Sequence, residues 1–375
     1  MRVLMISKAC VTASYRSKIA YMQQMADIDM GLVVPDHWDN LPFEPNASDA
    51  TYPIFKMPIR LNGRNHFHWY PHLTRIIREF KPDLVHMDEE HYSFVTWQGV
   101  RAAHKLGVPS LFFTWQNIYK RYPQPFSSIE QAVFQRTRGA IAGNRDAEEV
   151  LRKKGYSKPV TVIPQFGTDM ALFGPRDRLA LRRQYHIRQS FVVGYVGRLI
   201  EDKGIGDLLA AMQPLLEQHR DVGLLIVGTG PYDARIGEWT HAVGLNQQIT
   251  RVPWVSSDAM GDVMNLMDVL VLPSRTTSRW KEQFGRVLTE AMASQDVVIG
   301  SDSGEIPHVI GDAGLVFPEG DVPALGEAIR RVIDDAALRA TLARRGSDRV
   351  RDHFTQEAIA AKTCAFYRDL LGGMA

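Results

Sequence analysis

Short apolar segments alternate with amphipathic segments along the whole chain of 375 residues, and this alternation constrains the fold more than any other feature. Strands are expected at 3–7, 30–35, 84–87, 109–114, 140–143 and 160–164 in the first half, and at 191–196, 223–227, 248–252, 269–273, 297–300 and 314–318 in the second. Helical spacing lies between them, for example at 73–80, 146–154 and 205–217. Strands that alternate with helices favour parallel sheets and an α/β architecture.

The alternation is interrupted over residues 167–188, where glycine, proline and many charged residues give the composition of a linker. A chain of this length is long enough for two domains. We therefore expect an N-terminal domain over 1–170 and a C-terminal domain over 171–355. Helical spacing near the end of the chain predicts a final helix within 356–375.

Composition argues against several classes of protein. No apolar run approaches the roughly 18–20 residues of a membrane span, and the first residues read as a strand rather than a signal peptide. The two cysteines, Cys10 and Cys364, are far apart, which argues against a disulfide framework or a zinc site and fits a reducing cytoplasm. The net charge of +2 gives no indication of nucleic-acid binding.

Charge is distributed unevenly between the two halves. Residues 1–165 carry 21 Lys and Arg against 15 Asp and Glu, a balance of +6, and the remainder has a balance of −4. A basic N-terminal half could favour an anionic acceptor or a membrane surface. We therefore expect a cytoplasmic protein that can make peripheral contact with the inner membrane face. The sequence does not define its oligomeric state.

Two carboxylates, Glu282 and Glu290, bracket a segment that follows a buried strand and opens a helix at Gly285. The first turn of a helix offers backbone N–H groups to an anion. Carboxylates repel an anion, so these two are expected to accept hydrogen bonds from hydroxyl groups on either side of it. A phosphate flanked by hydroxyls is the chemistry of a nucleotide-sugar. For an arbitrary pair, a helix cap and a solvated glutamate would be the ordinary interpretation.

A second group of residues suited to phosphate follows the strand at 191–196. Gly197 allows a ligand to approach the backbone, and Arg198 and Lys203 lie on the same loop. Guanidinium and ammonium groups suit phosphate oxygens. The turn at Gly228 and Gly230 is weak evidence alone, because it lacks the third glycine of a dinucleotide fingerprint.

These motifs resemble those of the retaining glycosyltransferases of family 4, which have the GT-B fold. The segment from Glu282 to Glu290 resembles E-x-F-G-x-x-x-x-E, 197–204 resembles G-R-x-x-x-x-K-G, and 227–231 resembles V-G-x-G-P. The resemblance is specific over about residues 160–320 and looser before them. It implies two Rossmann-like parallel-sheet domains facing a cleft, with the helix in 356–375 crossing back onto the first.

The resemblance also implies a role for each matching residue. Glu282 would contact the donor sugar, Glu290 would hold the ribose hydroxyls, and Arg198 and Lys203 would stabilise the departing phosphate. Glu282, Arg198 and Lys203 are thus the expected catalytic residues. Trp254 follows a strand where the family lines its nucleobase slot, and it could stack on a base or simply pack. The expected donor-binding residues are Gly197, Gly228, Gly230, Trp254, Val255, Gln283, Phe284, Gly285, Arg286, Val287 and Glu290.

The first domain departs more from the family pattern. A polar, basic loop follows the first strand, at the strand end where ligands bind in open α/β sheets. Asp88 and Gln116 each end a later strand, at positions where relatives often have a histidine. A neutral amide at Gln116 rules out general-base catalysis by a histidine there. The expected acceptor-binding residues are Lys8, Tyr15, Arg16, Lys18, Asp88 and Gln116.

The implied activity is retaining transfer of a sugar from a UDP- or GDP-sugar to a hydroxyl acceptor, in glycan, glycolipid or glycosylated-metabolite synthesis. Asp27-Ile28-Asp29 resembles the D-x-D motif of metal-dependent transferases, but it precedes an early strand instead of following a nucleotide-binding one. His66 and His68 lack further ligands, so no metal and no cofactor is expected. Three alternatives remain open. They are a glycoside hydrolase using Glu282 with Glu290, an epimerase of nucleotide-sugars, and a non-catalytic nucleotide-sugar binding protein.

Overall fold

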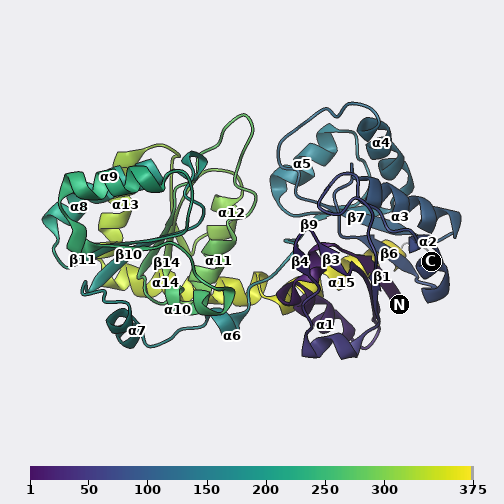
Figure 1. Ribbon diagram of the computed structural model, residues 1–375, viewed down its shortest axis with the longest axis horizontal. Coiled ribbons are helices and arrows are strands. Elements are labelled where there is room, and N and C mark those ends of the chain that lie inside the picture. Colours follow the sequence, from purple (N-terminus) through teal and green to yellow (C-terminus); the bar gives the residue numbers. More distant parts are fainter. Residues whose placement is uncertain (373–375) are drawn as a thin grey trace. The chain divides into compact units, whose positions relative to one another are not determined.

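The computed structural model describes residues 1–372, the side chain of Ser48 excepted, and the chain divides into two compact units. Unit 1 contains Met1–Gly167 together with the chain from Gln356, and unit 2 contains Thr168–Thr355. Figure 1 shows the path of the chain through the sheet and helices of each unit. The division falls at the beginning of the segment 167–188.

Unit 1 is built on a seven-stranded parallel sheet with the strand order β5-β2-β1-β6-β7-β8-β9. Its strands are β1 (Arg2–Ile6), β2 (Asp29–Pro35), β5 (Ile54–Met57), β6 (Leu84–Met87), β7 (Ser110–Thr114), β8 (Gly139–Ala142) and β9 (Val160–Val162), and β3 (His37–Trp38) and β4 (Leu41–Pro42) form a separate hairpin. Its helices are α1 (Ser17–Gln23), α2 (Leu73–Phe80), α3 (Phe94–Lys105), α4 (Phe126–Arg136), α5 (Arg145–Lys153) and α15 (Gln356–Gly372).

Helices cover both faces of this sheet, because the side chains of a strand alternate between its faces. Val3 and Met5 of β1 pack with residues of α1 and α15, whereas Leu4 and Ile6 pack with residues of α2 and α3. The final helix α15 also bonds to the sheet, since the hydroxyl of Tyr367 lies 2.6 Å from His86 Nδ1.

Unit 2 is built on a six-stranded parallel sheet with the strand order β12-β11-β10-β13-β14-β15. Its strands are β10 (Phe191–Val196), β11 (Val222–Val227), β12 (Ile249–Val252), β13 (Val269–Leu272), β14 (Val297–Ser301) and β15 (Gly314–Phe317). Its helices are α6 (Met170–Phe173), α7 (Arg178–Gln184), α8 (Ile205–Gln218), α9 (Asp233–Val243), α10 (Met260–Met264), α11 (Arg286–Ala293), α12 (Ile306–Ile310), α13 (Val322–Asp334) and α14 (Ala336–His353). Val193 packs with α8 and α13 on one face, and Val192 with α10 and α11 on the other.

The predicted α/β fold of two parallel-sheet domains is confirmed, and every expected strand is present within one or two residues of its bounds. The strand β5 was not predicted. It has four residues between Pro53 and Pro58 and lies at the edge of its sheet. Proline has no N–H to donate to a neighbouring strand and is therefore confined to the edges of sheets. The two flanking prolines made this short edge strand difficult to predict from the sequence.

Candidate functional site

The centre of the candidate site in unit 2 is an ion pair between Lys203 and Glu282. Lys203 ends a short 3-10 turn after β10, and Glu282 lies between β13 and α11. Lys203 Nζ is 2.6 Å from Glu282 Oε2, and both side chains are largely buried. The hydroxyl of Ser274 donates to the same oxygen over 3.0 Å. Two residues from separate motifs, 79 positions apart, are therefore joined in one pair.

Two glycines allow close contacts between backbone segments on either side of this pair. A Cβ on Gly204, which follows Lys203, would lie 1.8 Å from the carbonyl oxygen of Pro273. A Cβ on Gly304 would lie 2.0 Å from the carbonyl oxygen of Glu282. Both glycines have positive φ, which other residues rarely adopt. The absence of side chains at these two positions lets the loops approach closely enough for the ion pair to form.

Gly204→Ala is expected to destabilise unit 2 more than Gly244→Ala does. The two glycines have φ of 67° and 68°, so the cost of left-handed backbone, about 1 kcal/mol, is shared by both variants. Only the Cβ at 204 meets backbone, because nothing lies within 4 Å of one at Gly244. We expect a further loss of about 2 kcal/mol for Gly204→Ala, measured by urea unfolding. Equal losses in the two variants would contradict the close packing.

Trp280 is a residue of this site that the sequence did not single out. Lys203 Nζ lies 4.8 Å from the centroid of its ring, within the range of a cation–π interaction. The backbone N–H of Thr277 donates to the carbonyl of Trp280 over 2.8 Å, and Arg275 Nε is 2.7 Å from Asp207 Oδ2. The loop before Glu282 is therefore anchored, and its indole borders the lysine. The only sequence signal for Trp280 is its position two residues before Glu282.

The carboxyl ends of β10, β11 and β12 lie side by side next to the ion pair. Val196 pairs with Val227, and Val227 pairs with Val252. Gly197 and Gly228 follow the first two strands, and a Cβ on Gly228 would lie 1.9 Å from the carbonyl oxygen of Gly197. A cavity of about 300 Å³ opens here. It is lined by Leu199, Ile226, Gly228, Asp233, Arg251, Val252 and Pro253.

The other expected donor residues at this strand edge lie on the surface. Arg198 is exposed, and its carbonyl accepts a hydrogen bond of 2.8 Å from the hydroxyl of Tyr195. Trp254 is 76% exposed, and Val255 is half-buried. Gly230 is held close to Leu199, whose carbonyl oxygen would lie 2.3 Å from a Cβ at that position. The guanidinium of Arg198 and the indole of Trp254 are thus both accessible from solvent.

The helix α11 opens as the sequence predicted. Gly285 is its N-cap residue with φ of 77°, and Phe284 and Val287 pack against the core of unit 2. Arg286 Nε lies 3.2 Å from Glu290 Oε1. Burial raises the pKa of Glu290, and Arg286 opposes that rise. Gln283, by contrast, is exposed at the start of this turn.

In unit 1 the cations of the loop after β1 are engaged by the protein itself. Lys8 pairs with the buried carboxylate of Glu89. Arg16 is completely buried and bonds to Asp49 and to the carbonyls of Cys10, Val11 and Glu44. These bonds hold the loop together, and complete burial leaves no part of the Arg16 side chain exposed to an acceptor. The loop composition did not reveal this, because burial of an arginine depends on carboxylates and carbonyls elsewhere in the chain.

The remaining acceptor candidates also contact other side chains or carbonyls of unit 1. Lys18 Nζ donates to the carbonyl of Gln165 over 2.7 Å, and the ring of Tyr15 stacks on Phe166 with centroids 3.9 Å apart. Asp88 Oδ2 accepts from the hydroxyl of Ser7 over 2.8 Å. Burial would raise the pKa of Asp88, but nearby positive charge, with Lys18 first, and hydrogen bonds hold it below its ordinary value. Gln116 Nε2 donates to the hydroxyl of Tyr122 over 2.8 Å.

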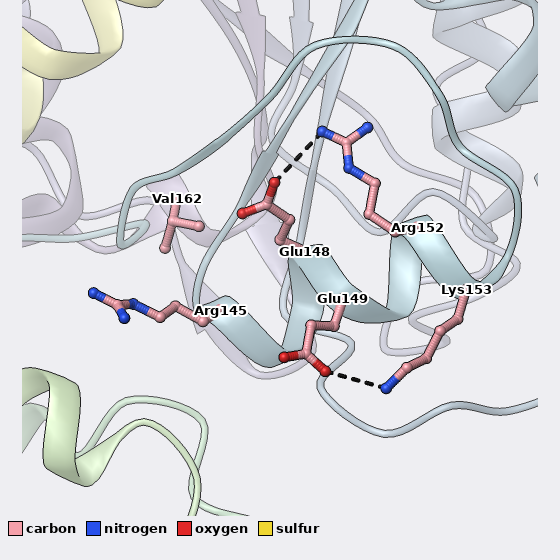
Figure 2. Close-up of a pocket in the computed structure, with 6 residues that line it drawn as sticks. All are labelled: Arg145, Glu148, Glu149, Arg152, Lys153 and Val162. Atoms are coloured by element: carbon pink, nitrogen blue, oxygen red, sulfur yellow. Dashed lines mark hydrogen bonds and ion pairs between the residues drawn. The ribbon is translucent and has the colours of Figure 1, made fainter.

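A separate pocket lies along α5 in unit 1 (Figure 2). Arg152 and Lys153 pair with Glu148 and Glu149, one helical turn earlier, over 3.4 Å and 3.1 Å. The charges of these pairs cancel within the helix. None of the residues expected to bind a donor or an acceptor lines this pocket, and we assign it no chemistry.

The structure adds two observations on metals and membranes. Asp27 and Asp29, the pair that resembled a metal motif, are bonded to Arg368 and Arg2, respectively. Over residues 1–372, no three His, Cys, Asp or Glu side chains come together in a group suited to a metal ion. In the same part of the chain, no helix has the length and apolar character needed to cross a membrane.

Comparison with known families matches most of the chain. Residues 177–349 match the family described as "Glycosyl transferases group 1", and residues 19–166 match the family described as "Glycosyltransferase Family 4". The first match lies within unit 2 and the second within unit 1.

The individual proteins that resemble this chain are also named as glycosyltransferases. The chain is 30% identical to the capsular polysaccharide biosynthesis glycosyltransferase CapM of Staphylococcus aureus over 52% of its own length and 51% of that protein. It therefore spans about half the length of this relative. It is 26% identical to the 2-deoxystreptamine glucosyltransferase of Streptomyces kanamyceticus over 80% of both chains. The crystal structure of Anabaena HepE in complex with UDP shares the fold, with a TM-score of 0.74 and 18% identity over 98% of this chain and all of that one.

Proposed function

The chain belongs to glycosyltransferase family 4 and has the GT-B fold, and from this premise we propose that it transfers a sugar from a nucleoside-diphosphate sugar to a hydroxyl acceptor with retention of configuration. A UDP- or GDP-sugar is the proposed donor. HepE was solved with UDP and with UDP-glucose. A relative in Mycobacterium tuberculosis is named as a GDP-mannose-dependent mannosyltransferase.

The observation that carries the proposal is the arrangement of Lys203, Glu282 and Arg198 in unit 2. Lys203 and Glu282 form a largely buried pair beside the opening turn of α11. Arg198 lies just after the neighbouring strand β10 and is exposed to solvent. Two cations and a helix N-terminus suit a diphosphate. The cavity beside Gly228 offers a slot for the nucleobase at the same edge. Glu290 is proposed to hold the ribose and Glu282 the sugar.

The proposed reaction breaks the bond between the anomeric carbon and the phosphate oxygen. Negative charge then develops on the diphosphate, where Arg198, Lys203 and the first turn of α11 stabilise it. The acceptor oxygen bonds to the anomeric carbon from the same face, and its proton passes to a departing phosphate oxygen. No separate protein base is needed for this balance. We also propose that no metal or other cofactor takes part.

The glycoside hydrolase alternative is less favoured by the contacts of the two carboxylates. Glu282 is bonded to Lys203, and Glu290 to Arg286. A hydrolase needs one carboxylic acid that can protonate the leaving group while the other acts as base or nucleophile. Burial raises the pKa of Glu290, as a proton donor would need, but a hydrolase would leave the exposed Arg198 and the paired Lys203 without a function.

The acceptor and the setting of the reaction are also proposals. Unit 1 is proposed to bind the acceptor at the carboxyl edge of its sheet, near Lys8, Tyr15, Lys18, Asp88 and Gln116. CapM acts in capsular polysaccharide biosynthesis according to its name. We propose a role in glycan, glycolipid or glycosylated-metabolite synthesis, in the cytoplasm or in peripheral contact with the inner membrane face.

The proposal is tested by a thermal-shift screen of UDP-, GDP-, ADP- and TDP-sugars. A donor that binds only the folded state stabilises it by about 2.7 kcal/mol at 100 times its Kd, so the correct nucleotide raises the melting temperature. The best donor is then incubated with acceptors, and the anomeric configuration of the product is determined by NMR.

The outcomes of that screen separate the alternatives. Conversion of the donor to another nucleotide-sugar without any acceptor would identify an epimerase. Binding with neither transfer nor conversion would identify a binding protein, and inversion at the anomeric carbon would contradict the retaining mechanism. No stabilisation by any nucleotide-sugar would reject the proposed function.

A further inference from the structure

The carboxyl edge of the sheet in unit 1 carries an acidic side chain that belongs to none of the family motifs. Glu90 follows β6, next to Glu89. Its Oε2 accepts from the hydroxyl of Thr114 over 2.6 Å, and its Oε1 accepts from the backbone N–H of Trp115 over 2.8 Å. Each carboxylate oxygen can accept two hydrogen bonds, so one position on each oxygen is still available. The side chain is 24% exposed, so a ligand can reach it.

Among the described residues, no lysine or arginine forms an ion pair with Glu90. Its one ion-pair neighbour there is His91 Nδ1, at the limiting distance of 4.0 Å. The nearby basic side chains have other partners. Lys8 pairs with Glu89, Arg16 with Asp49, and Lys18 donates to a carbonyl. These three cations of the loop after β1 are therefore already engaged by the protein.

An independent observation points to a ligand beside Glu90. Gln116 is only 8% exposed, and its Oε1 is buried without a hydrogen-bond partner. Its backbone N–H donates over 3.1 Å to the hydroxyl of Thr114, the same hydroxyl that bonds to Glu90. Asp88 Oδ1 is likewise buried and unpartnered. A buried acceptor without a donor is costly, and a ligand that donates hydrogen bonds would remove that cost.

We propose that this edge selects an acceptor substrate that donates hydrogen bonds and carries no negative charge, with Glu90 as the carboxylate that binds it. The favoured class is an amino-substituted sugar or cyclitol, followed by neutral polyols. Carboxylated and phosphorylated compounds are rejected, because their oxygens would face the carboxylate of Glu90. This inference rests on the proposed function, and it replaces the expectation of an anionic acceptor drawn from the charge balance of the N-terminal half.

The test compares D-glucose with two sugars that each differ from it at one substituent, an amine at C2 or a carboxylate at C6. D-glucosamine, D-glucose and D-glucuronic acid are titrated into the full-length protein without donor, and binding is followed by saturation-transfer difference NMR at pH 7. We expect glucosamine to bind about tenfold more tightly than glucuronic acid, with glucose between them. Glu90→Gln should remove the advantage of glucosamine over glucose, and Glu90→Lys should reverse the order of the two charged sugars.

Glu149→Gln provides the matched control. It makes the same change in charge on the exposed face of α5, where Glu149 pairs with Lys153, and the order of the sugars should not change. Equal binding of glucuronic acid and glucosamine, an unchanged order in Glu90→Gln, or no binding of any of the three would overturn the inference. Failure of the proposed function is distinct, because it appears as absence of stabilisation by every nucleotide-sugar in the thermal-shift screen.

Discussion

Alanine at Arg198 or Lys203 is expected to lower the rate of sugar transfer at least about 100-fold, which is the usual loss when one preorganised donor to a developing negative charge is removed. Both side chains lie where the diphosphate is proposed to leave, and Lys203 is held there by Glu282 and the ring of Trp280. The effect should appear mainly in kcat, since the charge develops in the transition state. Initial rates with the donor found by thermal shift provide the measurement.

Arg235→Ala is the control for these variants. Arg235 is an exposed arginine of unit 2 that pairs with Glu201 on the surface, and its loss should change transfer by less than about twofold. Circular dichroism should be the same for all variants, since the core residues are unchanged. A well-folded Arg198→Ala, Lys203→Ala double variant with near-normal transfer would reject the phosphate assignment.

Glu282→Ala is expected to cause a loss of similar size, at least about 100-fold, for a different reason. The carboxylate accepts from Lys203 and Ser274, and in our proposal it also accepts from the donor sugar. Its removal leaves the Lys203 ammonium without its partner and takes away the group that orients the sugar. Glu282→Gln keeps the shape but not the charge, so transfer should fall less far than in Glu282→Ala. Steady-state rates for both variants decide this order.

Glu217→Ala serves as the reference for the Glu282 variants. Glu217 lies on the exposed side of α8 and bonds to Gln213 one turn away, so its loss should leave transfer unchanged. Nearly normal activity in Glu282→Ala would remove Glu282 from the site. A Glu282→Ala variant that still binds the nucleotide-sugar but no longer transfers would locate the loss in the reaction rather than in folding.

Local sequence patterns were sufficient to predict most of the strands and helices. The apolar runs at 191–196 and 269–273 became the buried strands β10 and β13, because a strand covered on both faces must be apolar along its whole length. Helical spacing placed α2 and α8 within one residue of their bounds. The glycine before Arg286 marked the opening of α11, since a residue with φ of 77° is readily supplied only by glycine.

The motifs also named Lys203 and Glu282, but as separate residues with separate partners. Their ion pair depends on two loops from different strands, and the close approach of those loops depends on Gly204 and Gly304. Trp280 joined the site for the same reason, because its distance from Lys203 is set by the anchoring of its loop. Contacts of this kind follow from strand order and loop geometry, which local periodicity does not contain.

The order of strands and helices, the two-domain α/β architecture and the donor-site motifs could be read from the chain because they depend on neighbouring residues. The partners of individual charged side chains could not be read from it. Arg16 was expected to bind an acceptor and is buried within its loop. Glu90 was not among the expected site residues, and no lysine or arginine of the described residues pairs with it. Whether a charge is free depends on which distant groups the fold brings within about 4 Å of it, where the Coulomb energy becomes appreciable. Only the tertiary structure decides that.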